Sequence, residues 1–116
     1  MKILLILNDA PYGSERGYNG LRLANNLVKS EEDLNLTLFL MGDAVACAKQ
    51  GQKTPDGYYN VERMLKPLVR RGEVLLCGTC MDARGLAESE LVDGARRSTL
   101  DELSAKTLSA EKIMVF

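Results

Sequence analysis

The chain has 116 residues, 46% of them hydrophobic and 27% charged, a balance typical of one folded domain over residues 1–116. The formal net charge is −1, which argues against nucleic acid as the main partner, because nucleic-acid-binding proteins usually gather lysine and arginine on one face. No segment holds the ~18–20 apolar residues that a membrane-spanning helix needs, and the N-terminus does not resemble a signal peptide. We therefore expect a cytoplasmic protein without a membrane partner.

The first half of the chain alternates predicted strands and helices. Lys2–Leu7 is a continuous apolar run, which predicts a strand buried on both faces, and the polar loop Asn8–Ser14 follows it. Ser14 is a predicted N-cap of the helix that comes next. Leu34–Met41 predicts a second buried strand, and Asp43–Lys49 a short helix.

The middle of the chain holds one irregular segment and one helix. Gly51–Tyr58 has the least regular pattern, and we expect it to form a mobile lid. Asn60–Arg71 has the apolar spacing of a helix, although Pro67 predicts a kink because proline removes a backbone hydrogen bond. Glu73–Leu76 is the third predicted strand.

The last third of the chain contains two weaker elements and two stronger ones. Met81–Ala87 predicts a short helix, and Gly94–Arg97 a short strand. Ser98–Asp101 has the pattern of a capping box that opens a helix ending near Leu108. Lys112–Phe116 predicts a final buried strand.

This alternation of strands and helices predicts an α/β fold. The expected architecture is a three-layer α/β/α domain with a Rossmann-like, open, mostly parallel five-stranded sheet. Ligands of such sheets bind beyond the carboxyl ends of the strands. Those ends are Asn8–Gly13, Gly42–Asp43 and Cys77–Cys80, so two cysteines are expected at the functional edge.

The two cysteines stand in the stretch LLCGTCMDARG, residues Leu75–Gly85. A metal site is one interpretation, but structural zinc usually needs four Cys or His ligands. The chain has no histidine and one further cysteine, Cys47, so it does not supply such a ligand set, and we expect no metal.

Three other interpretations of the cysteine pair stay open at this point. A thioredoxin-like dithiol fits the CxxC spacing, although the repeated parallel units fit a thioredoxin scaffold poorly. Burial as small apolar residues suits Cys47, between Ala46 and Ala48, better than it suits the polar surroundings of the pair. A nucleophilic or sulfur-carrying thiolate is the third, with Arg84 as a nearby positive charge and Gly85 permitting a tight turn.

The order and spacing of several stretches resemble the DsrE/DsrF-like sulfur-relay family, and within it the small YchN-like branch. The resemblance covers nearly the whole chain. It rests on NDAPYGSE with the following LRLA, then LFLMGDAV, GQK and GYYN, CGTCMDARG, LVDG, and TLDELSAKTLSAEKIMVF.

The resemblance implies a Rossmann-like α/β domain that passes sulfur as a cysteine persulfide and assembles as a homo-trimer or homo-hexamer. The family's acceptor cysteine ends the third strand, eight residues before a glycine that follows an arginine. Cys77 matches that position, with Arg84 and Gly85 after it. Cys80 is the extra cysteine of the YchN-like branch, which the relay proteins with established roles generally lack.

Further residues are expected to flank the site. Asn8, Pro11, Tyr12 and Gly13 follow the first strand, and Tyr12 is a candidate to cover the thiolate. Asp43 follows the second strand and matches the family's GDAV turn, where it can cap the short helix or contact substrate.

The sequence therefore predicts a persulfide carrier that uses Cys77, with Cys80 as a resolving or auxiliary thiol and with sulfur donor and acceptor proteins as partners. It leaves open whether such a carrier is a sulfurtransferase enzyme. No metal, nucleotide or flavin cofactor is expected. The alternatives are a CxxC dithiol redox protein, and a non-enzymatic oligomeric binding module in which the cysteines merely line a crevice.

Overall fold

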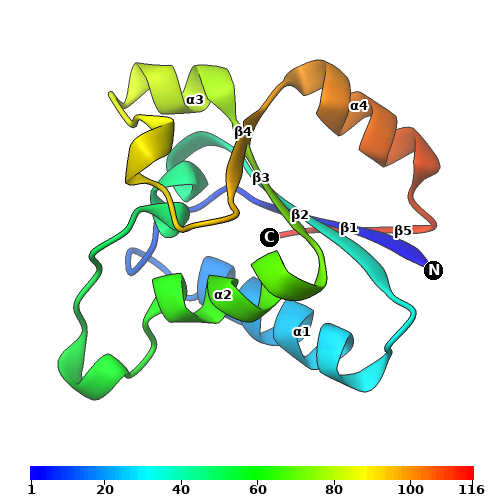
Figure 1. Cartoon of the computed structure of the whole chain (residues 1–116), viewed down its shortest axis with the longest axis horizontal. Coiled ribbons are helices and arrows are strands. Elements are labelled where there is room, and N and C mark those ends of the chain that lie inside the picture. Colours follow the sequence, from blue (N-terminus) through cyan, green and yellow to red (C-terminus); the bar gives the residue numbers. More distant parts are fainter.

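The computed structural model describes the whole chain, residues 1–116, around a five-stranded sheet (Figure 1). The strands are β1 (Lys2–Leu7), β2 (Asn35–Leu40), β3 (Glu73–Cys77), β4 (Arg96–Ser98) and β5 (Lys112–Val115). Their order is β4-β3-β2-β1-β5, and every neighbouring pair is parallel. The predicted α/β fold is confirmed, and the sheet is parallel throughout.

Helices cover both faces of the sheet. Helices α1 (Arg16–Ser30) and α2 (Val61–Arg71) pack on one face, and α4 (Leu100–Ser109) lies on the other (Figure 1). Because successive side chains of a strand point to opposite faces, the apolar strands supply two cores. The larger lies under α1 and α2, and the smaller joins α4 to the sheet through Leu4, Phe39, Leu75 and Leu103.

Shorter elements connect these layers. Helix α3 (Gly78–Ala83) follows β3 directly, and three 3₁₀ turns occupy the connections: η1 (Gly42–Ala48), η2 (Pro55–Gly57) and η3 (Glu88–Glu90). The short helix expected over Asp43–Lys49 is therefore the 3₁₀ turn η1. None of the helices is both long and apolar enough to cross a membrane.

Helices α1 and α4 each begin one residue later than their predicted N-caps imply. Helix α1 begins at Arg16 and not after Ser14, whose hydroxyl instead accepts the Arg16 N–H at 3.3 Å. The cap of α4 is Thr99, which accepts the Glu102 N–H at 3.1 Å. The predicted capping box at Ser98 was therefore one residue early, and Ser98 ends β4 instead.

Helix α2 continues through Pro67 as a single element, and the kink expected there stays a prediction. One expectation about a particular segment is corrected. Strand β5 was expected to be buried, but Ile113 is 44% exposed and Val115 is 61% exposed. The reason is position: β5 pairs only with β1 and forms one edge of the sheet.

The irregular segment Gly51–Tyr58 projects from the body at the lower left of Figure 1. Its first part is held to the end of η1, because the Gln52 side-chain amide donates to the carbonyls of Cys47 and Lys49, both at 2.9 Å. The Gln52 N–H donates to Glu62 on α2. The mobility expected of this segment stays a prediction.

Candidate functional site

The carboxyl ends of the central strands meet at one edge of the sheet. Leu7 of β1 pairs with Leu40 of β2, and Leu40 pairs with Leu76 of β3. Cys77, the last residue of β3, pairs with Ser98 at the end of β4. The loops that begin at Asn8, Met41 and Gly78 therefore leave the sheet at the same edge, as the predicted parallel topology requires.

Cys77 caps the helix that follows it. The structure places the start of α3 at Gly78, not at the predicted Met81, so Cys80 lies in the first turn of the helix and not before it. The Cys80 N–H donates to the Cys77 sulfur at 3.3 Å, and the Thr79 hydroxyl lies 3.3 Å from the same sulfur. The Cys77 sulfur thus takes the place that a Ser, Thr or Asp oxygen usually takes at a helix N-cap.

These surroundings favour a Cys77 thiolate. Partial burial by itself raises the pKa of Cys77, but hydrogen bonds to the sulfur from the Cys80 thiol, the Thr79 hydroxyl and both backbone N–H groups outweigh it. The net result is a pKa of Cys77 below the usual thiol value. Hydrogen bonds to the charged form of a group stabilise that form.

Cys80 behaves in the opposite way. Burial and its hydrogen bond to Cys77 raise the pKa of Cys80, and the Gly42 backbone and the charge of Arg84 offset only part of that rise. Both thiols are half-buried and neither forms a disulfide. Cys77 is therefore the more acidic thiol and the nucleophile, and the Cys80 thiol donates a hydrogen bond to it.

Arg84 lies on the Cys80 side of the pair. Its guanidinium donates to one carboxylate oxygen of Asp43 at 2.8 and 2.9 Å, and to the Cys80 carbonyl at 2.9 Å. Arg84 therefore ties α3 to η1, and its charge acts on Cys80. Asp43 does not cap η1, which was one of the two roles expected for it, because η1 has no side-chain cap and Asp43 pairs with Arg84 instead.

Gly85 provides the turn that ends α3. Its φ is +63°, in the left-handed region, and its N–H donates to the Asp82 carbonyl at 3.1 Å. The Leu86 N–H donates to the Met81 carbonyl at 3.0 Å, which completes a Schellman motif. The predicted tight turn at Gly85 is confirmed, and it directs the chain away from the cysteines.

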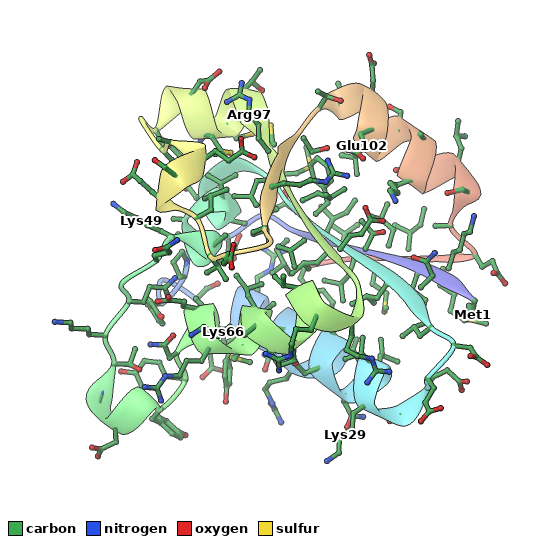
Figure 2. All side chains as sticks on the ribbon, viewed as in Figure 1. Met1, Lys29, Lys49, Lys66, Arg97 and Glu102 are labelled. Atoms are coloured by element: carbon green, nitrogen blue, oxygen red, sulfur yellow. The ribbon has the colours of Figure 1, made fainter.

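Arg97, which the sequence patterns did not single out, lies beside the residue that follows Cys77. The Arg97 guanidinium packs against Gly78 so closely that a Cβ at this glycine would lie 2.7 Å from Arg97 Nε. Asp82 holds the guanidinium in a two-bond pair at 2.7 and 2.8 Å (Arg97 is labelled in Figure 2). The Asp82 hydrogen bond and, more weakly, the charge of Cys77 raise the pKa of Arg97.

A signal for Arg97 was present but weak. Arg96 and Arg97 stand next to each other in a strand, so their side chains point to opposite faces of the sheet. Arg96 binds Glu102 of α4, whereas Arg97 reaches α3. Alternation along the predicted strand could have separated the two residues, but only the pairing of β4 with β3 brings Arg97 beside Cys77.

The residues after β1 do not gather around Cys77. The Asn8 side chain donates to the Phe116 carbonyl at 3.1 Å and so fastens the end of β5. The Tyr12 hydroxyl donates to the Gln52 side chain and accepts the Val61 N–H at 3.2 Å. Tyr12 is thus committed to the start of α2, with Gly13 beside it in the same cavity wall. Pro11 makes no side-chain contact that gives it a role.

Cys47 is an ordinary core residue, as expected. It is fully buried, its thiol lies 3.8 Å from the Asp9 carbonyl, and burial raises the pKa of Cys47 to about 12. No group of three or more His, Cys, Asp or Glu side chains is arranged to hold a metal ion. The chemistry that the site can offer is that of an activated thiolate beside a second thiol.

Comparison with known proteins gives full-length matches. The model of the DsrE/DsrF-like family matches residues 1–116. Protein YchN of Escherichia coli K12 is 47% identical over 116 residues, which cover 99% of this chain and 98% of YchN. The crystal structure of the E. coli protein superposes with a TM-score of 0.95 over 100% of this chain and 99% of that one.

A more distant relative is named as a homolog of TusC. A TusC homolog of Vibrio parahaemolyticus is 29% identical over 119 residues, which cover 99% of this chain and 98% of the homolog. The matches to both relatives thus extend over nearly the whole chain.

Proposed function

The chain belongs to the DsrE/DsrF-like family, a family implicated in sulfur relay, and we propose that it accepts and passes on sulfur as a persulfide of Cys77. The observation that carries the proposal is the position of the Cys77 sulfur at the N-cap of α3, where the Cys80 N–H donates to it at 3.3 Å and the Thr79 hydroxyl lies 3.3 Å from it. The pKa of Cys77 is lowered and that of Cys80 is raised, so Cys77 is the thiol that ionises first. Thiolates, not thiols, are the nucleophiles of sulfur exchange.

The loading step is an exchange at the outer sulfur of a donor persulfide. The Cys77 thiolate attacks that sulfur, a bond forms from Cys77 Sγ, and the S–S bond of the donor breaks. The donor leaves as a thiolate, and the outer sulfur with its proton stays on Cys77. No electrons are gained or lost overall, so no oxidant or cofactor is needed.

Unloading is the same exchange in reverse toward a different thiol. An acceptor thiolate attacks the outer sulfur, and Cys77 leaves as a thiolate. The donors at Thr79 and Cys80 then stabilise the leaving sulfur as they stabilise the resting thiolate. A sulfur with a lowered pKa is also a better leaving group, so the same contacts assist both directions.

Cys80 supports a second candidate function, a dithiol redox role. Its thiol is hydrogen-bonded to Cys77, close enough to influence the first sulfur. If the Cys80 thiolate attacks Cys77 Sγ of the persulfide, a Cys77–Cys80 disulfide forms and hydrosulfide leaves. The disulfide must then be reduced by an external dithiol.

The proposed carrier works as a homo-trimer or homo-hexamer that meets donor and acceptor proteins at the cysteine edge. Half of the exposed large hydrophobic side chains support self-association, because they lie on β5 and α4. They are Leu100, Leu108, Ile113 and Val115, with exposed fractions of 69%, 89%, 44% and 61%. Such side chains at an unpaired sheet edge are a frequent interface between copies.

The test is transfer in two stages. The protein is treated with glutathione persulfide, freed of excess donor, and weighed intact by mass spectrometry before and after addition of an acceptor thiol. We expect the mass of one sulfur atom to appear and then to disappear in the wild type and in Cys80→Ala, but not to appear in Cys77→Ser. Cys47→Ala serves as the matched control for loss of a cysteine.

Three outcomes oppose the proposal in different ways. Sulfur uptake by Cys77→Ser at the wild-type level would assign the reaction elsewhere. Loss of two hydrogen masses with release of sulfide, and no retained sulfur, would favour the dithiol redox role. Absence of any reaction in the wild type would favour the non-enzymatic binding module.

A further inference from the structure

All four tyrosines of the chain line two adjoining cavities that the sulfur chemistry does not use. The first cavity, of about 480 Å³, lies between the loop after β1 and the start of α2 and is lined by all four. The rings of Tyr12 and Tyr59 meet edge to face at 6.0 Å, and those of Tyr58 and Tyr59 at 5.1 Å. Neither Cys77 nor Cys80 lines this cavity.

The second cavity, of about 870 Å³, runs between α1 and α2 and shares Tyr18 and Tyr59 with the first. One stripe of α1 forms its wall, because Tyr18, Arg22 and Lys29 are spaced i, i+4 and i+11 and so lie on one side of the helix. Arg63 of α2 lines the opposite wall.

The charge of these cavities is positive. Arg22, Lys29 and Arg63 form no ion pair with a carboxylate, and Glu15 is the single acidic residue that lines either cavity. The Arg22 guanidinium lies 5.7 Å from the centre of the Tyr18 ring. A cation and an aromatic face are therefore presented side by side, although the net charge of the chain is −1.

The walls are held in place before any ligand arrives. The Asn25 amide on α1 donates to Leu21 of its own helix and to the Met64 carbonyl of α2, both at 2.9 Å. Tyr12 and Tyr59 have left-handed backbones, with φ of +68° and +50°. This conformation is uncommon for aromatic residues and is typically retained where a functional site requires it.

We propose that the joined cavities bind a ligand in which a planar aromatic ring is linked to a phosphate, the chemistry of a nucleotide. Tyrosine faces stack on planar bases, and arginine pairs with phosphate oxygens through a fork of donors. The combined size suits a ligand of this class. The site takes no part in the persulfide exchange, and its ligand is a separate binding function and not a cofactor of sulfur transfer.

The same chemistry is offered by a free mononucleotide and by a single-stranded nucleic acid. The two sources are distinguished by affinity, since several successive bases would extend along the groove between α1 and α2. Inorganic phosphate and adenosine supply the two halves of the ligand separately.

The tyrosines themselves provide the readout. With 3-fluorotyrosine incorporated, the protein has four ¹⁹F resonances, all of which belong to this site. AMP, adenosine, inorganic phosphate and a short single-stranded adenylate oligonucleotide are titrated in turn. We expect saturable shifts with AMP at millimolar concentration or below, and weaker binding of adenosine and of phosphate alone.

The variants Arg22→Gln and Arg63→Gln remove the expected phosphate partners, and Lys66→Gln is the matched control. Lys66 stands on α2, three residues after Arg63, carries the same charge, and lines neither cavity (labelled in Figure 2). We expect each arginine variant to weaken AMP binding at least about fivefold and the lysine variant to leave it unchanged.

Tighter binding of the oligonucleotide than of AMP would identify nucleic acid as the source. The proposal is overturned if neither AMP nor the oligonucleotide shifts a resonance. It is also overturned if adenosine binds as well as AMP, or if Lys66→Gln weakens binding as much as the arginine variants. None of these outcomes depends on sulfur uptake by Cys77.

Discussion

At the scale of single residues, the account depends on which of two neighbouring thiols ionises first. Cys77 accepts hydrogen bonds from Thr79 and from Cys80, whereas Cys80 gives up its hydrogen to Cys77. The usual pKa of a free cysteine is about 8.5. The alkylation rate of Cys77 should therefore reach half its maximum below this pH, and that of Cys80 above it.

Peptide mass spectrometry after timed treatment with iodoacetamide at a series of pH values measures both rates. In Cys80→Ala the half-maximum for Cys77 should move to higher pH, because one hydrogen bond to the sulfur is lost and the Cys80 backbone N–H remains. Cys47 is the internal reference and should stay unmodified in the folded protein, since it is fully buried. Equal rates for Cys77 and Cys80 at all pH values would contradict the assignment.

The Arg97–Asp82 pair offers a second test at this scale, because removing either partner should shift the pKa of Cys77 in opposite directions. Removing the cation in Arg97→Gln should raise the pKa of Cys77, and Asp82→Asn should lower it, because the guanidinium loses its neutralising partner. Each shift should be small, since the pair is close to solvent. The same pH series of alkylation measures both.

Arg96→Gln is the control for Arg97→Gln, because the neighbouring arginine carries the same charge and binds α4. It should leave the pKa of Cys77 unchanged. A shift of equal size in both arginine variants would mean that Arg97 acts only through the total charge of the protein. Shifts of the same sign in Asp82→Asn and Arg97→Gln would mean that the pair acts only as a structural contact.

At the scale of elements, an ion-pair network fastens the three-residue strand β4 to its neighbours. Arg96 of β4 binds Glu102 of α4 at 2.7 and 3.0 Å, and it reaches Glu73 of β3 at 3.4 Å. Lys106 of α4 also binds Glu73. Because β4 is only three residues long and has no apolar side chain, these ion pairs add to its backbone pairing with β3 beside the cysteine edge.

Glu102 makes this network sensitive to acid. The hydrogen bond from Arg96, followed by that from Ser98, lowers the pKa of Glu102 to about 2, against about 4.3 in the unfolded chain. A lowered pKa contributes stability that is fully present above the unfolded value and is lost as the pH falls from about 4 to about 2.

Urea unfolding of wild type and Glu102→Gln therefore should differ by about 1 kcal/mol at pH 7, a modest value because the pair is partly exposed. The difference should shrink as the pH approaches 2. Glu32→Gln, which removes an exposed glutamate without an ion pair, should show no such trend. A constant difference between wild type and Glu102→Gln from pH 7 to pH 2 would contradict the role of the charge.

The sequence predicted the order and type of the main elements because the spacing of apolar residues reflects which face of each strand or helix is buried. It misplaced α3 because Gly78 and Thr79 have loop-like composition, and a cysteine is not among the usual capping residues. The Arg97 contact was missed for a different reason. It depends on which strand lies beside β3, and strand order is a tertiary property that local pattern does not contain.

At the scale of the whole molecule, the exposure of β5 is the main departure from expectation. An apolar run such as KIMVF predicts a buried strand, but it does not distinguish a central strand from an edge strand that is covered by another chain. Ile113 and Val115 are exposed in the single chain described here. Burial by further copies would reconcile the sequence pattern with the position of the strand.

We therefore expect a trimer or hexamer in solution, measurable by size-exclusion chromatography with light scattering. Val115→Lys with Leu108→Lys should shift the mass toward the monomer, because each places a charge in the proposed interface. Lys53→Glu and Lys112→Glu change two exposed lysines, of which only Lys112 belongs to β5, so comparing them separates the effect of position from that of charge. A wild-type protein that is monomeric at all concentrations would contradict the assembly.

The most direct test of the central claim is the location of the sulfur after loading with a persulfide donor. Trypsin places Cys77 and Cys80 on one peptide, Gly72–Arg84, so fragmentation of that peptide must separate the two sites. The account predicts an added sulfur on Cys77, with Cys80 recovered as the alkylated thiol. An added sulfur on Cys80 with Cys77 unmodified would contradict it.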